Sequence, residues 1–267
     1  MDGGASMTTP VRSALGRLTQ PSVYLPVCFG IVFLIAWEVY GRAMNPLLFA
    51  PPSALVDAAG GLIESGRLQD AIVITLTTLT VGVVISLVTG IAVGVALGRL
   101  PGLSDVVEPY IDGIYATPRI VLTPLIIIWF GIGFWGRVFV IWLGTAIPIM
   151  LSTAIGVRHS RPDLIEVGRS FQASERDLLR HVILPGAVPY VLTGIKIGMG
   201  RALIGVVIAE MFLDLTGIGG IIRTEASRFR VPEALLGVLI FAILGTILIG
   251  AVGALERRFS AWKQEGV

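Results

Sequence analysis

Four ionisable side chains interrupt the apolar stretches of this sequence: Glu38, Lys196, Arg201 and Glu210. Ionisable groups are costly inside a bilayer and often mark a solute or proton pathway. On a helix, Arg201 lies about 140° from Lys196 and about 180° from Glu210, so the three do not form one polar stripe like a proton relay. Because they lie inside a predicted span, Lys196, Arg201 and Glu210 remain candidate translocation-pathway residues. The simpler alternative is that their side chains snorkel toward a helix end.

Other side chains that could carry chemistry are scarce. The sequence has two lysines, Lys196 and Lys263, and neither follows a glycine-rich phosphate-binding loop. Its two histidines, His159 and His181, do not form a helical zinc pair, and no G-x-S-x-G nucleophile motif occurs. We expect no catalytic site, no metal and no cofactor in this chain, and no nucleic-acid partner.

The elements that hold these residues are membrane spans. The chain of 267 residues is 54% hydrophobic and 14% charged, with a mean hydropathy of +0.86. Several charge-free runs, such as Ala71–Gly98 and Ala234–Leu255, reach the roughly twenty residues that a helix needs to cross a bilayer. The sequence predicts an all-α polytopic membrane protein. Its six transmembrane helices are expected at Tyr24–Tyr40, Ile72–Leu97, roughly Leu122–Phe134 with some residues before it, Val138–Val157, Pro189–Leu213 and Ala234–Leu255.

The distribution of positive charge predicts the orientation. With the N-terminus inside, the inner segments hold 12 Lys or Arg and the outer segments hold 6, and cytoplasmic loops carry the excess of positive charge. We therefore expect both termini in the cytoplasm. The domain organisation is a cytoplasmic N-terminal segment (1–22), one transmembrane domain (23–255) and a cytoplasmic tail (256–267). The polar loop 158–190 then lies on the cytoplasmic side.

Small residues recur at intervals of four in two of the predicted spans. Such spacing lets helix backbones approach closely in a membrane. It is compatible with packing inside the chain or with a dimer interface. The residues are Gly82, Ser86, Gly90, Gly94 and Gly98 in the second span, and Ala242, Thr246, Gly250 and Ala254 in the sixth.

The loop 158–190 is the most charged part of an otherwise apolar chain, and it predicts two short helices joined by a turn. Ser160, followed by Pro162, is expected to cap the first helix. Ser174 is expected to cap the second, which would end near Leu184, before Pro185. Both helices carry apolar residues: Leu164, Ile165, Val167 and Phe171, then Leu178, Leu179, Val182 and Ile183. These faces either bind another protein or pack beneath the membrane helices.

The ends of this loop resemble the EAA signature of the permease subunits of ABC importers. The matching residues are Glu166-Val167-Gly168 and Ile183-Leu184-Pro185. Residues 49–53, 125–133, 187–196, 202–211 and 217–220 are similar to the nitrate/sulfonate/taurine branch of that family, so the resemblance runs from about residue 46 to residue 250. It implies an architecture in which a cytoplasmic coupling helix docks into a cleft of a separate ATPase subunit.

The resemblance also implies partners and a location. The partners are two ABC ATPase subunits, which bind ATP and Mg, an external solute-binding protein, a second permease copy in a homodimer, and the lipid bilayer. The location is the bacterial inner membrane. The cargo of the branch is a small anion such as nitrate, an alkanesulfonate or taurine, with heterocycles also known. A stand-alone secondary transporter or channel is the alternative function.

By the same resemblance, the ATPase-coupling residues are Glu166, Val167, Gly168, Gln172, Ala173, Ser174, Leu184 and Pro185. Two of them depart from the family pattern. Val167 replaces a small residue, and Gln172 stands where the family has a glycine that permits a sharp turn. We expect the turn either to shift onto Ala173 or to bend differently.

Overall fold

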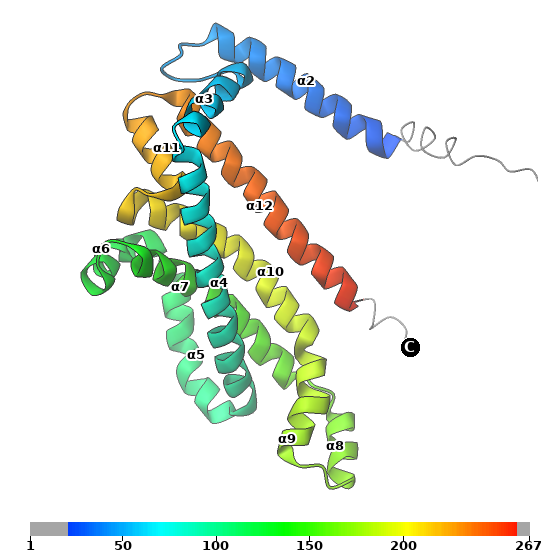
Figure 1. Cartoon of the computed structure of the whole chain (residues 1–267). Helices are drawn as coiled ribbons and strands as arrows, with labels where there is room; N and C mark the ends of the chain where they lie inside the picture. Colours follow the sequence, from blue (N-terminus) through cyan, green and yellow to red (C-terminus); the bar gives the residue numbers. More distant parts are fainter. Residues whose placement is uncertain (1–20, 261–267) are drawn as a thin grey trace, which may run out of the picture.

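A computed structural model describes residues 21–260 of the chain (Figure 1). Every regular element in this range is helical, which confirms the predicted all-α class. The expected N-terminal segment and C-terminal tail lie largely outside the described residues. The helices are α2 (Pro21–Ala43), α3 (Pro52–Glu64), α4 (Arg67–Arg99), α5 (Pro101–Ala116), α6 (Arg119–Phe130), α7 (Phe134–Arg158), α8 (Pro162–Ser170), α9 (Glu175–Leu178), α10 (Leu184–Ala209), α11 (Gly217–Ser227) and α12 (Val231–Ser260).

Five helices of the described range are long and apolar enough to cross a membrane, and the bent pair α5–α6 makes a sixth span if it is counted as one. The predicted number of spans is therefore confirmed. The predicted spans at Tyr24–Tyr40, Ile72–Leu97, Val138–Val157 and Ala234–Leu255 lie within α2, α4, α7 and α12.

The third span was expected to include some residues before Leu122, and the structure confirms that it does. The helical segment begins at Pro101, and α5 and α6 meet at a bend of 101°. Proline lacks a backbone N–H and disfavours a helical conformation in the residue before it. Thr117, which precedes Pro118, accordingly has extended backbone angles. Arg119 is the first residue of α6.

The centre of the molecule is α7, which packs between α4 and α10. The glycine stripe of α4 faces α7: a Cβ atom added at Gly82 would lie 2.7 Å from Ile141, and one added at Gly98 would lie 2.5 Å from Val157. Packing inside the chain therefore accounts for the small residues of the second span. The stripe of the sixth span differs, because a Cβ at Gly250 would meet nothing within 4 Å in the described chain.

The fifth span begins much earlier than predicted. Helical structure runs without a break from Glu175 to Asp214, through α9, a π-helical segment at Leu179–Ile183, α10, and a second π-helical segment at Glu210–Asp214. The prediction that the insert helix stops before Pro185 is wrong. The π-helical segment ends at Ile183, two residues before this proline, and the Leu184 N–H donates to the Leu179 carbonyl. This i to i+5 bonding lets the helix continue past a residue that has no N–H to donate.

The short helices lie at two opposite ends of the molecule. Figure 1 shows α8 and α9 at one end of the α4–α7–α10 bundle and α3 and α11 at the other. Only 6% of the apolar window of α2 is buried, and this helix diverges from the bundle at the α3 end. We call residues 158–190, which contain α8 and α9, the insert.

Candidate functional site

The insert is built around a tight turn between α8 and α9. The Gln172 N–H donates to the Arg169 carbonyl at 2.9 Å, and the Ala173 N–H donates to the Gly168 carbonyl at 3.0 Å. This pair of bonds is the Schellman motif, which needs a left-handed residue after the helix end. Gln172 takes that conformation, with φ of 58°. The expectation that Ala173 would take over the turn is therefore wrong: Gln172 occupies the position itself, although a glycine would adopt it more easily.

Gly168 allows the two insert helices to approach closely. A Cβ at this position would lie 2.5 Å from Cδ2 of Leu178, a side chain that is almost fully buried. The predicted cap at Ser174 is confirmed, because its Oγ accepts a hydrogen bond from the Asp177 N–H at 3.2 Å. The predicted cap at Ser160 is wrong: the helix starts one residue later, after Arg161, without a side-chain cap.

The two apolar faces of the insert have different environments. Leu178 and Ile183 are buried, and Ile183 packs against Val157 and Ala187 of the membrane helices. In α8, Leu164 and Val167 are exposed, as is Phe171 directly after the helix (82% accessible), while Ile165 is half-buried against the same cluster. Packing beneath the membrane helices is therefore confirmed for the second helix, and binding of another protein stays a prediction for the first. We define the α8 surface as the exposed residues Leu164, Val167 and Phe171.

A groove of about 750 Å³ lies beside α8. It is lined by Arg158, Ser160, Pro162, Ile165, Glu166, Arg169 and Ser170. Glu166 is exposed. At the edge of the insert, Arg161 donates a hydrogen bond to Asp163, which lowers the pKa of that exposed carboxyl and keeps it charged. A charged groove next to an apolar patch is the composition of a protein interface, with an apolar centre and a polar rim.

Ion pairs tie the insert to the membrane helices. Glu175 accepts from Arg99 of α4 at 2.6 Å and from Arg169 of α8 at 3.2 Å. Arg158, at the end of α7, pairs with Glu108 of α5. The remaining two predicted coupling residues, Leu184 and Pro185, lie in the first turn of α10 and join the insert to this helix. The insert is therefore linked to α4 by an ion pair and continues directly into α10.

The three predicted pathway residues do not meet in one site. Lys196 of α10 forms an ion pair with Glu256 of α12, at 2.9 Å. The Arg201 guanidinium lies over the ring of Tyr115, 4.9 Å from the ring centroid. Glu210 is fully buried at the other end of α10. The separation of these side chains agrees with the angles calculated for one helix.

The two carboxylates predicted inside spans both bind the first turn of a short helix. Glu210 accepts a hydrogen bond from the Gly219 N–H of α11 at 2.9 Å, and Glu38 accepts one from the Ser53 N–H of α3 at 3.0 Å. The first N–H groups of a helix lack partners within the helix, and a negative charge there is favourable. Each carboxylate thus fixes a short helix at the end of the molecule opposite the insert.

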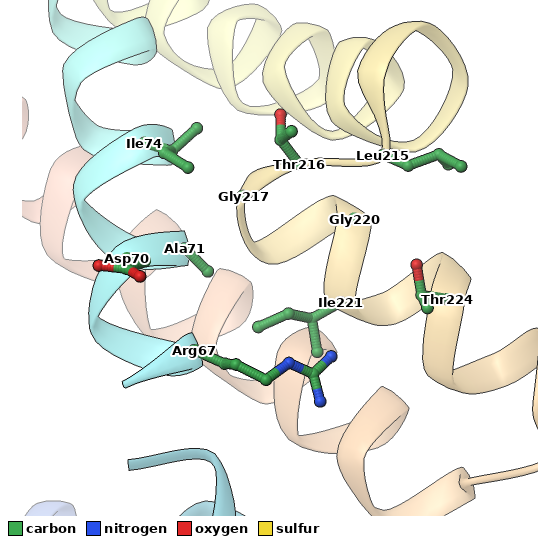
Figure 2. Close-up of a pocket in the computed structure, with 10 residues that line it drawn as sticks. All are labelled: Arg67, Asp70, Ala71, Ile74, Leu215, Thr216, Gly217, Gly220, Ile221 and Thr224. Carbon is green, nitrogen blue, oxygen red and sulfur yellow. The ribbon is translucent and has the colours of Figure 1, made fainter. Parts of the chain in front are cut away.

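A second charged cluster, which sequence reasoning missed, joins α4 to α11. Glu225 is fully buried and accepts from Arg67 at 2.5 Å, while Arg230 and Arg228 lie at 3.7 and 3.9 Å from its carboxylate. Figure 2 shows Arg67 extending from α4 toward Ile221, at the rim of a pocket of about 230 Å³. Since 158 residues separate Arg67 from Glu225, no local pattern in the sequence reveals this contact.

Spanning helices with a polar helical insert at one end define a multi-span membrane protein. Residues 86–261 match the family described as binding-protein-dependent transport system inner membrane component, and the chain belongs to this family. The putative aliphatic sulfonates transport permease protein SsuC of Escherichia coli (strain K12) is 30% identical over 258 residues, 96% of each chain. The taurine transport system permease protein TauC of the same strain is 28% identical over 241 residues, 88% of each chain.

Another relative is the bicarbonate transport system permease protein CmpB of Synechococcus elongatus, 28% identical over 264 residues, which covers 94% of this chain and 91% of CmpB. These relatives confirm the resemblance to the nitrate/sulfonate/taurine branch of ABC importer permeases. A chain of the MetNI methionine ABC transporter has the same fold, with a TM-score of 0.58 at 19% identity, covering 72% of this chain and 94% of that one. The protein is thus an ABC importer permease, an inner-membrane component.

Proposed function

We propose that this chain is the transmembrane subunit of an ATP-driven importer for a small anion such as nitrate, an alkanesulfonate or taurine. Relatives named for taurine, aliphatic sulfonates and bicarbonate support this cargo class. Two ATPase subunits bind ATP and Mg and dock on the insert, and an external binding protein delivers the solute to two permease copies. The protein lies in the bacterial inner membrane with both termini in the cytoplasm. The chain has no ATP-hydrolysing site of its own.

The α8 surface is the observation that carries this proposal. A helix at the end of a membrane bundle gains nothing from apolar side chains that face water, since burying such a side chain is worth about 2 kcal/mol. Phe171 and Val167 are nevertheless exposed, next to a charged groove that contains Glu166. An ATPase cleft that covers α8 would bury this apolar surface and supply partners for the charges.

The structure also supports a route for the mechanical signal. The helical segment from Glu175 to Asp214 contains 40 residues, which corresponds to a length of roughly 60 Å. At one end it carries the insert, and at the other Glu210 binds the first turn of α11. When the ATPase subunits close, they move α8, and α10 carries this motion to α11. The permease is then a two-state element whose balance is set by the ATPase contacts.

Charge reversal in the insert tests the proposal. The Glu166→Lys variant is expected to lose co-purification with the ATPase subunit and ATP-driven solute uptake in proteoliposomes. The matched control is Glu64→Lys, another exposed glutamate, which lies on α3 at the opposite end of the molecule. Retention of both activities by Glu166→Lys would refute the docking role. Uptake driven by an ion gradient with this chain alone would instead establish a secondary transporter.

A further inference from the structure

The break between α5 and α6 brings two arginines together within the bundle. Helix α6 begins at Arg119, directly after the 101° bend, and its first turn has no side-chain cap. Irregular backbone at membrane depth is tolerated where it is buried in protein or lines a cavity. Broken spans also present the positive end of a helix dipole to anionic groups. The break therefore offers partial positive charge in addition to the arginine side chains.

The guanidinium group of Arg119 occupies a notch between α7 and α10. Its Nη1 donates to the Arg201 carbonyl at 3.1 Å. A Cβ added at Gly144 would lie only 1.7 Å from Nη1, and one added at Gly205 would lie 3.3 Å from it. The absence of side chains at these two glycines creates the space that the guanidinium group fills. Only one of its five N–H donors is engaged by the Arg201 carbonyl, which leaves others for a ligand.

The second guanidinium group, that of Arg201, is oriented by an aromatic ring. It lies over Tyr115, 4.9 Å from the ring centroid, a geometry that attracts a cation without using its hydrogen-bond donors. Tyr115, Arg119 and Arg201 line the same small cavity, together with Leu143 and Gly144. The cavity thus has two cationic side chains, contributed by α6 and α10.

In the described part of the chain, Arg119 and Arg201 form no ion pair, unlike Arg137 and Lys196. Arg137 pairs with Asp214 at 2.8 Å, and Lys196 pairs with Glu256 at 2.9 Å. Among the side chains that the structure describes, no carboxylate lies within ion-pair distance of Arg119 or Arg201. Two neighbouring cations without a counter-ion are costly in a membrane protein and are stabilised when an anion binds between them.

We propose that Arg119 and Arg201 form an anion site on the translocation pathway, which binds the oxyanion group of the solute during its passage. This inference rests on the proposed function and adds the residues that contact the cargo. Guanidinium groups match sulfonate, nitrate and bicarbonate oxygens with paired hydrogen bonds. The cavity has a volume of only about 10 Å³, room for roughly one water molecule. The site is therefore closed in this conformation and opens when α6 and α10 separate.

The decisive variant is Arg201→Gln, because the Arg201 side chain is not part of the notch that packs α6 against α7. In proteoliposomes with the ATPase and binding protein, uptake of ethanesulfonate or nitrate is expected to fall by about tenfold or more, while ATP hydrolysis stimulated by the loaded binding protein persists. Arg201→Lys is expected to restore part of the uptake. Arg42→Gln is the control, because Arg42 is exposed and lies on α2. Uptake by Arg201→Gln equal to that of Arg42→Gln would overturn the inference.

A measurement on the permease alone separates this inference from the proposed function. Thermal unfolding of the purified chain is followed at constant ionic strength while gluconate is replaced by nitrate or ethanesulfonate. The melting temperature is expected to rise for the unmodified protein and for Arg42→Gln, and to stay constant for Arg201→Gln. An equal rise in all three proteins would overturn the anion site, even if ATP-driven import is established. If the unmodified chain does not bind the ATPase but its melting temperature still rises with the anion, the proposed function is refuted and the anion site is not.

Discussion

Replacing Gly94 with alanine tests whether the glycine stripe of α4 packs against α7. A Cβ at this position would lie 2.5 Å from the Met150 carbonyl oxygen and 2.6 Å from Cβ of Thr153, where ordinary contacts are 3.4–4 Å. Both atoms are fixed to the α7 backbone, so the two helices must separate by about 1 Å. Such overpacking costs about 1–3 kcal/mol, and the better helix propensity of alanine offsets at most about 1 kcal/mol. We expect a net loss of about 1–2 kcal/mol.

The assay is thermal or denaturant unfolding of the purified protein in one detergent, with Gly250→Ala as the matched control. Gly250 belongs to the small-residue stripe of α12, and an added Cβ there would meet nothing within 4 Å. Gly250→Ala is expected to be neutral or slightly stabilising. If Gly94→Ala unfolds at the same point as Gly250→Ala, then the α4 stripe does not pack as described, and the reasoning from close approach fails.

Two further substitutions test local features of the structure. Gln172→Gly removes the side chain from the left-handed position and is expected to stabilise the insert by about 1 kcal/mol. The measurement is proteolysis of residues 158–190, which is expected to be slower in Gln172→Gly than in Gln172→Ala. Equal proteolysis rates would contradict the strain assigned to this turn. Glu225→Gln leaves Arg67 without a charged partner and is expected to cost about 2 kcal/mol of stability, less than a fully buried pair because Arg67 is 43% exposed. An unchanged melting temperature of Glu225→Gln would show that this pair does not hold α4 to α11.

The sequence predicted the elements that depend on neighbouring residues or on the apolar interior of the bilayer. Four spans were evident because lipid requires long charge-free helices. The cap at Ser174 followed from the residue types at the start of α9. The resemblance also located the insert, although it implied a glycine at position 172. The structure retains the turn there because the hydrogen bonds to Gly168 and Arg169 compensate for the unfavourable conformation of Gln172.

The extent of α5, the first half of the third span, was not predicted because this helix is not free of charge. Asp105, Glu108 and Asp112 interrupt α5, and Pro118 bends the chain before α6. Glu108 is stabilised by Arg158, a residue that is 50 positions away. A sequence pattern cannot show that Arg158 stabilises Glu108, because this ion pair depends on the packing of α5 near the end of α7.

The roles of the buried ionisable residues could not be predicted for a similar reason. Glu38 and Glu210 resemble pathway residues when only their depth in a span is considered. In the structure each binds N–H groups of a short helix that follows in the chain. The glycines at positions 217 and 219, soon after Glu210, were the available signal, because a backbone without Cβ atoms can approach a carboxylate closely. Arg119 gave no such signal, since its notch is formed by α7 and α10.

The central claim, that α8 docks into a separate ATPase, is tested most directly by labelling position 171. Cys28 is the one cysteine of the sequence and is exposed, so it is first replaced by serine. A Phe171→Cys variant is then treated with a maleimide, with and without the ATPase subunit. Val56→Cys serves as the control, because Val56 is 72% exposed and lies on α3. The account predicts that the ATPase strongly slows labelling at position 171 and leaves position 56 unaffected. Equally fast labelling of Phe171→Cys with the ATPase bound would contradict it.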